Sequence, residues 1–367
     1  MSDHVYYNFN IINTSPTQSI LAQKTDIRDD AIIKNPSEYY LSVIRFRVPT
    51  SEIPIFIAEI QPPPNVNPNN TVYSVTLAYG ATAIQTYIQW IPESNLTAPA
   101  NFYPPNSITN YPYYSVFSYN NFIQLVNTAF QTSFLALQKA VAPALATANA
   151  PFLLFDSYTS LFSITAQTQF YDEATASPYV QVFMNQKLFR LFASFASIEM
   201  FPSPAPNGED FRIRINSGWG TIISNEARFN PPTGAPALRM FQDYSTVYLW
   251  SIFANLLLTT SSIPVQNEYI PEKFETSVQS GFRPIMTDFT FNISVATDNR
   301  TYAIYIPTSE YRLINLRNNI PLNVLDIVIY WQDNLNNIYP LYIGINESAQ
   351  IKLLFRKKNW QNIKNIM

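Results

Sequence analysis

The chain has 367 residues, a formal net charge of −3, 47% hydrophobic and 15% aromatic residues, and only 13% charged residues. So much apolar material excludes a disordered chain, and so small a negative charge excludes an overall attraction to nucleic acid or anionic membrane. With no cysteine, there is no disulfide, thiolate metal site or cysteine nucleophile, which favours assembly in a reducing compartment.

Charged residues are about half as frequent as the roughly 25% usual in soluble domains, and Asn, Gln, Ser, Thr and Tyr take their place. Protein interfaces are depleted in Lys, Glu and Asp and enriched in Tyr and Phe, which predicts a chain largely covered by partners. A secreted β domain with an uncharged polar face is the alternative. MSDHVYYNFN lacks the pattern of a signal peptide, and the apolar run at 246–258 is too short for a membrane span.

Short strand-like runs open the chain, and they are expected at 5–10, 39–48, 53–60, 71–79 and 82–91. Within 39–48, simple alternation places Tyr40, Ser42, Ile44 and Phe46 on one side and Leu41, Val43, Arg45 and Arg47 on the other. Gly80 separates the last two runs. Because the chain has 7 Gly and 28 Pro, most turns are expected to use Asn, Asp and Pro-containing loops.

The middle of the chain has a different pattern. Residues 92–117 and 202–238 are irregular, and the latter range surrounds a strand at 211–216. Apolar residues every three or four positions predict a helix over 120–141, which Pro143 closes. A hairpin at 152–158 and 161–167, a strand at 179–185 and a short helix at 186–195 complete this part.

From residue 244 the chain returns to strands, expected at 246–260, 289–296, 301–306, 325–331, 339–345 and 351–355. They lack helices long enough for parallel crossovers, so the pattern predicts an all-β antiparallel sandwich. The expected division is a discontinuous sandwich over 1–95 and 240–367, with a mixed α/β insertion domain at 96–239 that carries the helix 120–141.

The stretch LLLTTSSIPVQNEY at 256–269 raises a catalytic alternative, with Ser261 and Ser262 as nucleophiles and Glu268 as a helper. The single histidine, His4, is close to the N-terminus, which argues against a Ser-His-acid triad and a zinc site. We therefore expect a corner after a long strand, in which hydroxyls satisfy backbone groups and Pro264 ends the pairing. Glu268 is expected to pair with a basic residue, and no catalytic, cofactor or metal residue is assigned.

Two sets of charged residues need separate interpretation. The acidic pairs Asp29-Asp30, Asp172-Glu173 and Glu209-Asp210 are interpreted as solvated loop acids, with a calcium loop or a glycosidase pair (Glu268 and Asp288) as weaker alternatives. Basic residues gather near the C-terminus, around Phe355 and Trp360, at Lys352, Arg356, Lys357, Lys358 and Lys364. They form a possible contact with nucleic acid or an acidic partner, although a final strand with a solvated tail is the preferred interpretation.

Several segments in order carry a family resemblance: NPSEYYLSVIRFRVPTSEIPIF, VFMNQKLFRLFASF, DYSTVYLWSIFANLLLTTSSIPVQNEY, RLINLRNNIPLNVLDIVIYWQDNLNNIYPLYI and IKLLFRKK. The chain resembles the penton-type minor capsid proteins of polinton-like viruses, adintoviruses and virophages, in the lineage of adenovirus-like double-stranded DNA viruses. The likeness covers most of the chain but contains no short diagnostic motif.

The resemblance implies an eight-stranded jelly roll with an insertion, located in the virion, with five copies at each capsid vertex beside the major capsid subunits. Insertion loops would then face a neighbour, a host receptor or a glycan. No Arg-Gly-Asp occurs, so integrin binding is not carried over. Three alternatives stay open: a carbohydrate- or receptor-binding sandwich, a compact jelly-roll major capsid subunit, and a hydrolase built on paired acids.

Overall fold

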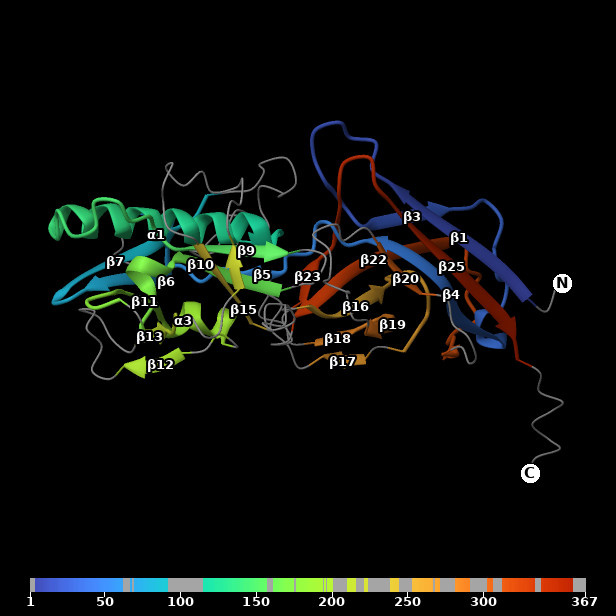
Figure 1. Ribbon diagram of the computed structural model, residues 1–367. Helices are drawn as coiled ribbons and strands as arrows, with labels where there is room; N and C mark the ends of the chain where they lie inside the picture. Colours follow the sequence, from blue (N-terminus) through green and yellow to red (C-terminus); the bar gives the residue numbers. More distant parts are fainter. Residues whose placement is uncertain are drawn as a thin grey trace, which may run out of the picture.

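The computed structural model describes most of the two ends of the chain and the ordered elements between them. The described residues are 4–61, 67, 69–91, 115–156, 161–174, 176–193, 195, 197–200, 210–215, 221–223, 238–243, 253–266, 268–270, 281–290, 302–305, 312–333 and 338–358. They form two units that lie end to end, each with its own hydrophobic core (Figure 1).

The first unit is a sandwich of two sheets. One sheet has the order β1 (His4–Ile12), β25 (Ser348–Lys357), β4 (Tyr39–Pro49) and β20 (Tyr302–Tyr305), with β21 (Ile314–Asn315) also on β4. The other has the order β19 (Ile285–Thr290), β16 (Phe253–Thr259), β22 (Val324–Asp333) and β23 (Ile338–Pro340), with β3 (Gln23–Ile27) also on β22.

These strands confirm the expected fold class. Without the short β21 and β23, the sandwich has eight strands, which in chain order are β1, β3, β4, β16, β19, β20, β22 and β25. If these are numbered 1 to 8, one sheet has the order 1-8-3-6 and the other has the order 2-7-4-5, and every pair is antiparallel. This is the order of a jelly roll, in which two Greek keys share one core. The outer end of β1 lies against the end of β25, at the end of the sandwich farthest from the second unit (Figure 1).

Strand alternation explains how the sandwich buries its core. In β1, Phe9 and Ile11 are buried while Asn8 and Asn10 are exposed, because successive side chains of a strand point to opposite faces. The same period continues in β25, where Ile351, Leu353 and Phe355 enter the core.

Simple alternation fails in β4, and a β-bulge is the reason. Arg45 pairs with Lys352 but Val43 pairs with Leu353, so Ile44 is an extra residue in the ladder. A bulge shifts the side-chain period by one residue. The inward face therefore changes from Leu41 and Val43 to Phe46 and Val48, which corrects the prediction that Phe46 shares a face with Tyr40.

The second unit is inserted between β4 and β16 and contains two sheets and a long helix. The first sheet has the order β12 (Ser197–Met200), β13 (Asp210–Ile213), β11 (Val180–Asn185), β6 (Asn70–Tyr79) and β7 (Thr82–Gln89). The second has the order β14 (Thr221–Ile223), β15 (Leu238–Asp243), β10 (Leu161–Gln167) and β9 (Phe152–Asp156).

Helix α1 (Tyr119–Ala140) lies along one side of this unit (Figure 1) and closely matches the prediction over 120–141. The Ser118 hydroxyl caps its start by accepting from the Asn121 N–H at 3.3 Å, as expected for an N-cap residue. Its apolar stripe, which includes Phe122, Phe130 and Phe134, is fully buried in the core that both sheets share. The Ser133 hydroxyl also donates to the Ile84 carbonyl at 2.6 Å, which fastens the helix to β7.

The hairpin β6–β7 was expected in the sandwich, within 1–95, but its partners lie in the second unit. β6 pairs with β11, and Val75, Leu77 and Ile88 belong to the core around α1. Its turn needs Gly80, whose φ of +59° is a conformation that side-chain-bearing residues rarely adopt. Asn318 and Asn346 are the other described residues with positive φ, consistent with the expected use of Asn in turns.

Smaller elements complete the described chain. They are the strand pairs β2 (Ile20–Leu21) with β24 (Tyr342–Ile343), β5 (Phe56–Ile57) with β8 (Ser115–Val116) and β17 (Glu268–Ile270) with β18 (Gly281–Arg283), and the helices η1 (Pro36–Glu38), α2 (Thr168–Tyr171), α3 (Gln186–Phe189) and η3 (Arg190–Phe192). The strand expected at 53–60 is thus only two residues long, and the one at 339–345 is split between β23 and β24. Residues 246–252 of the expected long strand lie outside the described residues.

Candidate functional site

Of the basic residues near the C-terminus, Lys352, Arg356 and Lys357 lie on the final strand and Lys358 follows it. Two of them are engaged by the sandwich itself. Lys357 lies 3.9 Å from the Glu38 carboxylate. Lys358 donates to the Ser37 carbonyl at 2.5 Å and to Asn315, and lies over the Tyr40 ring. Burial lowers the pKa of Lys358. These two residues therefore tie β25 to β4 and its flanking turns.

Lys352 and Arg356 instead point outward from the same strand, and Lys364 lies outside the described residues. Lys352 lies 5.0 Å from the centre of the Tyr6 ring, and Arg356 is exposed. The bulge in β4 places Arg45 and Arg47 beside them, both exposed. The sequence alone did not indicate that Arg45 and Arg47 lie beside Lys352, because the pairing of β4 with β25 joins residues about 300 positions apart. In addition, alternation without a bulge placed both arginines on the same face as the core residues Leu41 and Val43.

The corner at residues 259–264 is organised by a carboxylate that the sequence analysis did not single out. Asp326, on the adjacent strand β22, accepts hydrogen bonds from the Ser261 N–H at 2.8 Å, the Ser262 N–H at 2.7 Å and the Thr260 hydroxyl at 2.7 Å. The Ser261 hydroxyl donates to it at 2.8 Å. Burial raises the pKa of Asp326, but these hydrogen bonds outweigh burial and lower it to about 2.

This geometry confirms the structural interpretation of the corner and changes its detail. The hydroxyls of Ser261 and Ser262 bind mainly a side-chain carboxylate rather than backbone groups. Each hydroxyl donates a hydrogen bond to a carboxylate whose pKa is lowered to about 2, and so weakly basic a group is a poor general base at neutral pH. The side chain of Glu268 lies outside what the structure describes.

A second buried carboxyl lies where β4 leaves the sandwich for the second unit. Glu52 is 3% exposed, and its Oε2 atom has no hydrogen-bond partner among the described residues. Burial raises its pKa to about 8, the nearby Glu347 carboxylate adds to the rise, and a hydrogen bond with Ser19 opposes it. Glu347 is held by the Ser51 hydroxyl at 2.6 Å and the Gly344 N–H at 3.1 Å.

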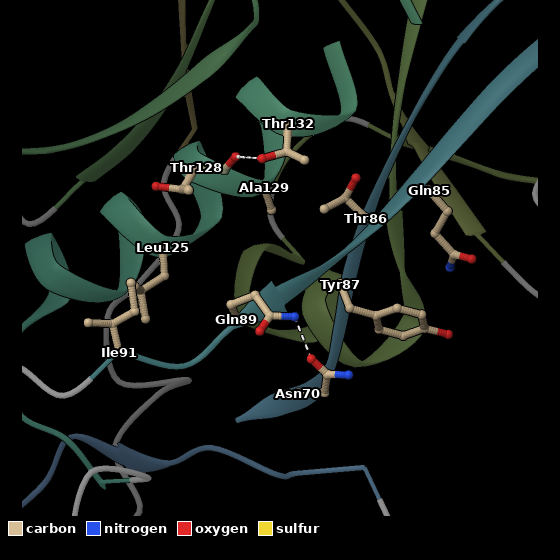
Figure 2. Close-up of a pocket in the computed structure, with 10 residues that line it drawn as sticks. All are labelled: Asn70, Gln85, Thr86, Tyr87, Gln89, Ile91, Leu125, Thr128, Ala129 and Thr132. Carbon is tan, nitrogen blue, oxygen red and sulfur yellow. Dashed lines mark hydrogen bonds between the residues drawn. The ribbon is translucent and has the colours of Figure 1, made fainter. Parts of the chain in front are cut away.

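A groove of about 350 Å³ lies between β7 and α1 in the second unit (Figure 2). Its lining has no charged residue and consists of Asn70, Gln85, Thr86, Tyr87, Gln89, Ile91, Leu125, Thr128, Ala129 and Thr132. Gln89 donates to Asn70, its facing partner on β6, and Tyr87 is among the lining residues (Figure 2). Amides, hydroxyls and one aromatic ring can bind an uncharged polar ligand.

The acidic pairs divide between solvent and buried contacts. Asp29 and Asp30 are exposed, as expected. Asp172 is fully buried, and Glu173 binds Arg214 at 2.6 Å, which corrects their interpretation as solvated acids. Of the nominal glycosidase pair, Asp288 forms an ion pair with Arg312.

The described residues provide neither a metal-binding cluster nor a membrane-spanning helix. They contain no cluster of three or more His, Cys, Asp or Glu side chains arranged for a metal ion. None of the described helices has the length and apolar character needed to cross a membrane.

Comparison with known proteins gives a consistent result over the whole chain. The family model described as Sputnik minor capsid protein V18/19 matches residues 5–357. Protein V18 of Sputnik virophage is 43% identical over 129 residues, which cover 33% of this chain and 72% of V18. Structural protein V19 of the same virophage is 26% identical over 211 residues, which cover 56% of this chain and 93% of V19.

Solved structures agree with the described fold. A chain in the 3.5 Å cryo-EM structure of the Sputnik virophage is similar with a TM-score of 0.80 and 30% identity, covering 98% of this chain and 99% of that one. The crystal structure of mavirus penton protein is similar in fold, with a TM-score of 0.60 and 14% identity, over 97% of this chain and 99% of that one.

Proposed function

We propose that this chain, which belongs to the Sputnik minor capsid protein V18/19 family, is a vertex subunit of which five copies form a ring. Membership of the family makes it a structural protein of the virion, assembled with other capsid proteins. The finer assignment to the vertex is supported by one observation above the others. The likeness to mavirus penton protein extends over 97% of this chain, both the jelly roll and the inserted unit.

The composition of the chain supports an assembled state. Only 13% of its residues are charged, and several large apolar side chains of the sandwich surface are exposed, among them Ile12 at 60%, Ile27 at 75% and Ile320 at 72%. Subunit contacts are the usual use of such surfaces. Closed rings of one chain also need no second protein to satisfy their contacts.

The mass of the purified chain in solution tests this proposal. Light scattering should give a mass near five times the 41.9 kDa of one chain, and negative-stain images of the same fraction should give five-fold rings. A trimer would favour a compact major capsid subunit instead. A chain that stays monomeric at high concentration would overturn the proposed ring.

We also propose that the sandwich and the inserted unit are separate domains, with the sandwich building the shell and the inserted unit facing a neighbour or the outside. Strand partners favour a first boundary near residue 54 rather than residue 95, because β6 and β7 pair within the inserted unit. The second boundary is retained near residue 240. Limited proteolysis should release a stable fragment that contains α1 together with β6 and β7.

No catalysis is proposed, and no cofactor is required by this role. The reason lies in the corner at 259–264, where the serine hydroxyls donate to Asp326, a carboxylate whose pKa of about 2 makes it a weak base. A hydrolase built on Glu268 and Asp288 is disfavoured because Asp288 is engaged by Arg312. Assays with glycoside and ester substrates should give the same rate for the wild type and for Asp288→Asn.

A second candidate function rests on the groove between β7 and α1. Its uncharged amide and hydroxyl lining, with Tyr87 in the wall, favours a glycan as the ligand of a host-receptor contact. A glycan array with the assembled protein should give hits that Tyr87→Ala abolishes. Tyr179→Ala, a tyrosine on the same unit outside the groove, is the matched control, and an array without hits would overturn this candidate.

A further inference from the structure

The outward face of the sheet β1-β25-β4-β20 carries cations at its centre. Strand register places Arg45 directly opposite Lys352, and Arg47 opposite Gln350. Arg356 follows two pairs beyond the bulge, opposite Tyr40 on one side and His4 on the other. Facing residues are about 5 Å apart across strands and successive outward residues about 7 Å apart along one strand, so Arg45, Arg47 and Lys352 are close neighbours. Arg356 lies about 13 Å farther along β25, beyond the outward Leu354. These four cations are here called the basic face.

Within the part of the chain that the structure describes, no carboxylate balances the basic face. Among the residues that the structure describes, none of these four cations forms an ion pair, whereas Lys24, Lys187, Arg212, Arg214, Arg312 and Lys357 all do. The outward positions of the four strands contain no Asp or Glu. Glu38 lies at the margin and is engaged by Lys357 and Asn35. In a chain with a net charge of −3, this is a local concentration of positive charge.

Aromatic rings accompany these cations. The Arg47 guanidinium lies 3.6 Å from the centre of the Tyr302 ring, and Lys352 lies over Tyr6, which is 55% exposed. Tyrosines on an open sheet surface provide stacking surfaces for bases, and neighbouring Arg and Lys bind phosphates. Both kinds of group are therefore presented together on one surface.

The distribution of apolar side chains decides between nucleic acid and an acidic protein as the partner. Protein interfaces have an apolar centre and a polar rim. Here the centre is cationic, and the exposed apolar residues, Ile12 and Ile304, lie on the outer strands β1 and β20. We propose that the basic face binds the phosphate backbone of nucleic acid without sequence preference. It replaces the C-terminal tail as the expected contact and does not depend on the proposed ring.

The test compares two triple variants that remove the same charge. Arg45→Gln/Arg47→Gln/Lys352→Gln removes three of the four charges of the basic face, and Lys34→Gln/Lys139→Gln/Arg190→Gln removes three exposed cations elsewhere that form no ion pair among the described residues. Binding of a fluorescent 20-base-pair DNA duplex by the full chain is measured by anisotropy at several salt concentrations. Each phosphate contact contributes about 0.9 to the slope of log affinity against log salt.

The expected result is a loss of at least about tenfold in affinity for the basic-face variant, with a slope smaller by about 2–3, and less than a twofold change for the control. Equal losses of affinity in both variants would overturn the proposal.

Competition provides a second outcome. If poly-glutamate competes more strongly than unlabelled duplex at equal charge, the basic face is assigned to an acidic protein and the proposal is overturned. A changed mass in light scattering with unchanged duplex binding would assign it to a contact between copies. If the wild-type chain is monomeric and the basic-face variant still loses duplex binding, the proposed five-fold ring is contradicted but the nucleic-acid proposal is not.

Discussion

The Asp326 carboxylate and the backbone N–H of Ser261 are 2.8 Å apart although they are separated by 65 residues in the chain. This contact closes the corner after β16 onto β22. The same carboxylate is 7% exposed and also binds the hydroxyls of Thr260 and Ser262. The buried Asp326 carboxylate thus satisfies the polar groups of the turn after β16. Its hydrogen bonds link the end of β16 to the neighbouring strand β22.

Asp326→Asn is expected to destabilise the sandwich by about 2–4 kcal/mol, because the amide group would face N–H and O–H donors that need an acceptor. The midpoint of urea unfolding measures the change. Asp288→Asn is the matched control, since Asp288 is 47% exposed and paired with Arg312, and it should cost less than about 1 kcal/mol. Equal effects of the two changes would contradict the role of Asp326.

The same carboxylate predicts an acid limit to stability. Its pKa is lowered to about 2 in the folded chain, against about 3.9 when unfolded. The unfolded state therefore binds the proton first as pH falls, so the stability that Asp326 contributes is complete above about pH 4 and is lost between about pH 4 and 2. The free energy of unfolding should fall less steeply in that range for Asp326→Asn than for the wild type. Parallel curves would contradict the assignment.

Glu52 predicts the opposite dependence at higher pH. Its folded pKa of about 8 lies above the ordinary value of 4.5, so the unfolded state loses its proton first as pH rises. Stability should decline from about pH 4.5 and reach its full loss, on the order of 5 kcal/mol, above pH 8. Glu52→Gln should flatten this decline and exceed the wild type in melting temperature at pH 9.

The control for Glu52 is Glu59→Gln, because the Glu59 side chain is 53% exposed and paired with Lys187. It should leave the pH dependence of melting unchanged. If Glu52→Gln lowers the melting temperature at pH 9 as much as at pH 5, Glu52 is not the group that titrates.

The sequence predicted the elements better than their partners. The period of apolar residues and the closing Pro143 located α1 to within one residue at each end, and strand patterns indicated the antiparallel sandwich and an insertion. The hairpin β6–β7 was assigned to the wrong sheet because alternation tells that a strand has one buried face, not what covers that face. Of the basic-face residues, Lys352 and Arg356 stood out in a basic run, whereas Arg45 and Arg47 did not.

Asp326 was missed for a similar reason. Within LDIVIYW at 325–331, an acid between apolar residues matches the outward position of a strand, and its donors are visible only after β16 and β22 are paired. Ser261 and Ser262 attracted attention as possible nucleophiles, yet what determines their chemistry is the carboxylate on the neighbouring strand. Local sequence gives residue types, and strand pairing decides their roles.

Deletion of Ile44 is expected to be tolerated, although it removes a residue from the middle of a core strand. Because Val43 already pairs with Leu353 and Arg45 with Lys352, removal of the extra residue leaves a regular ladder with Phe46 still inward. Deletion of Lys352 from β25, which has no extra residue there, should turn one half of its inward face to solvent. We expect the first variant to remain soluble with a loss of about 1–2 kcal/mol and the second to unfold. Urea unfolding and circular dichroism measure both, and unfolding of the Ile44 deletion would show that the bulge itself is required.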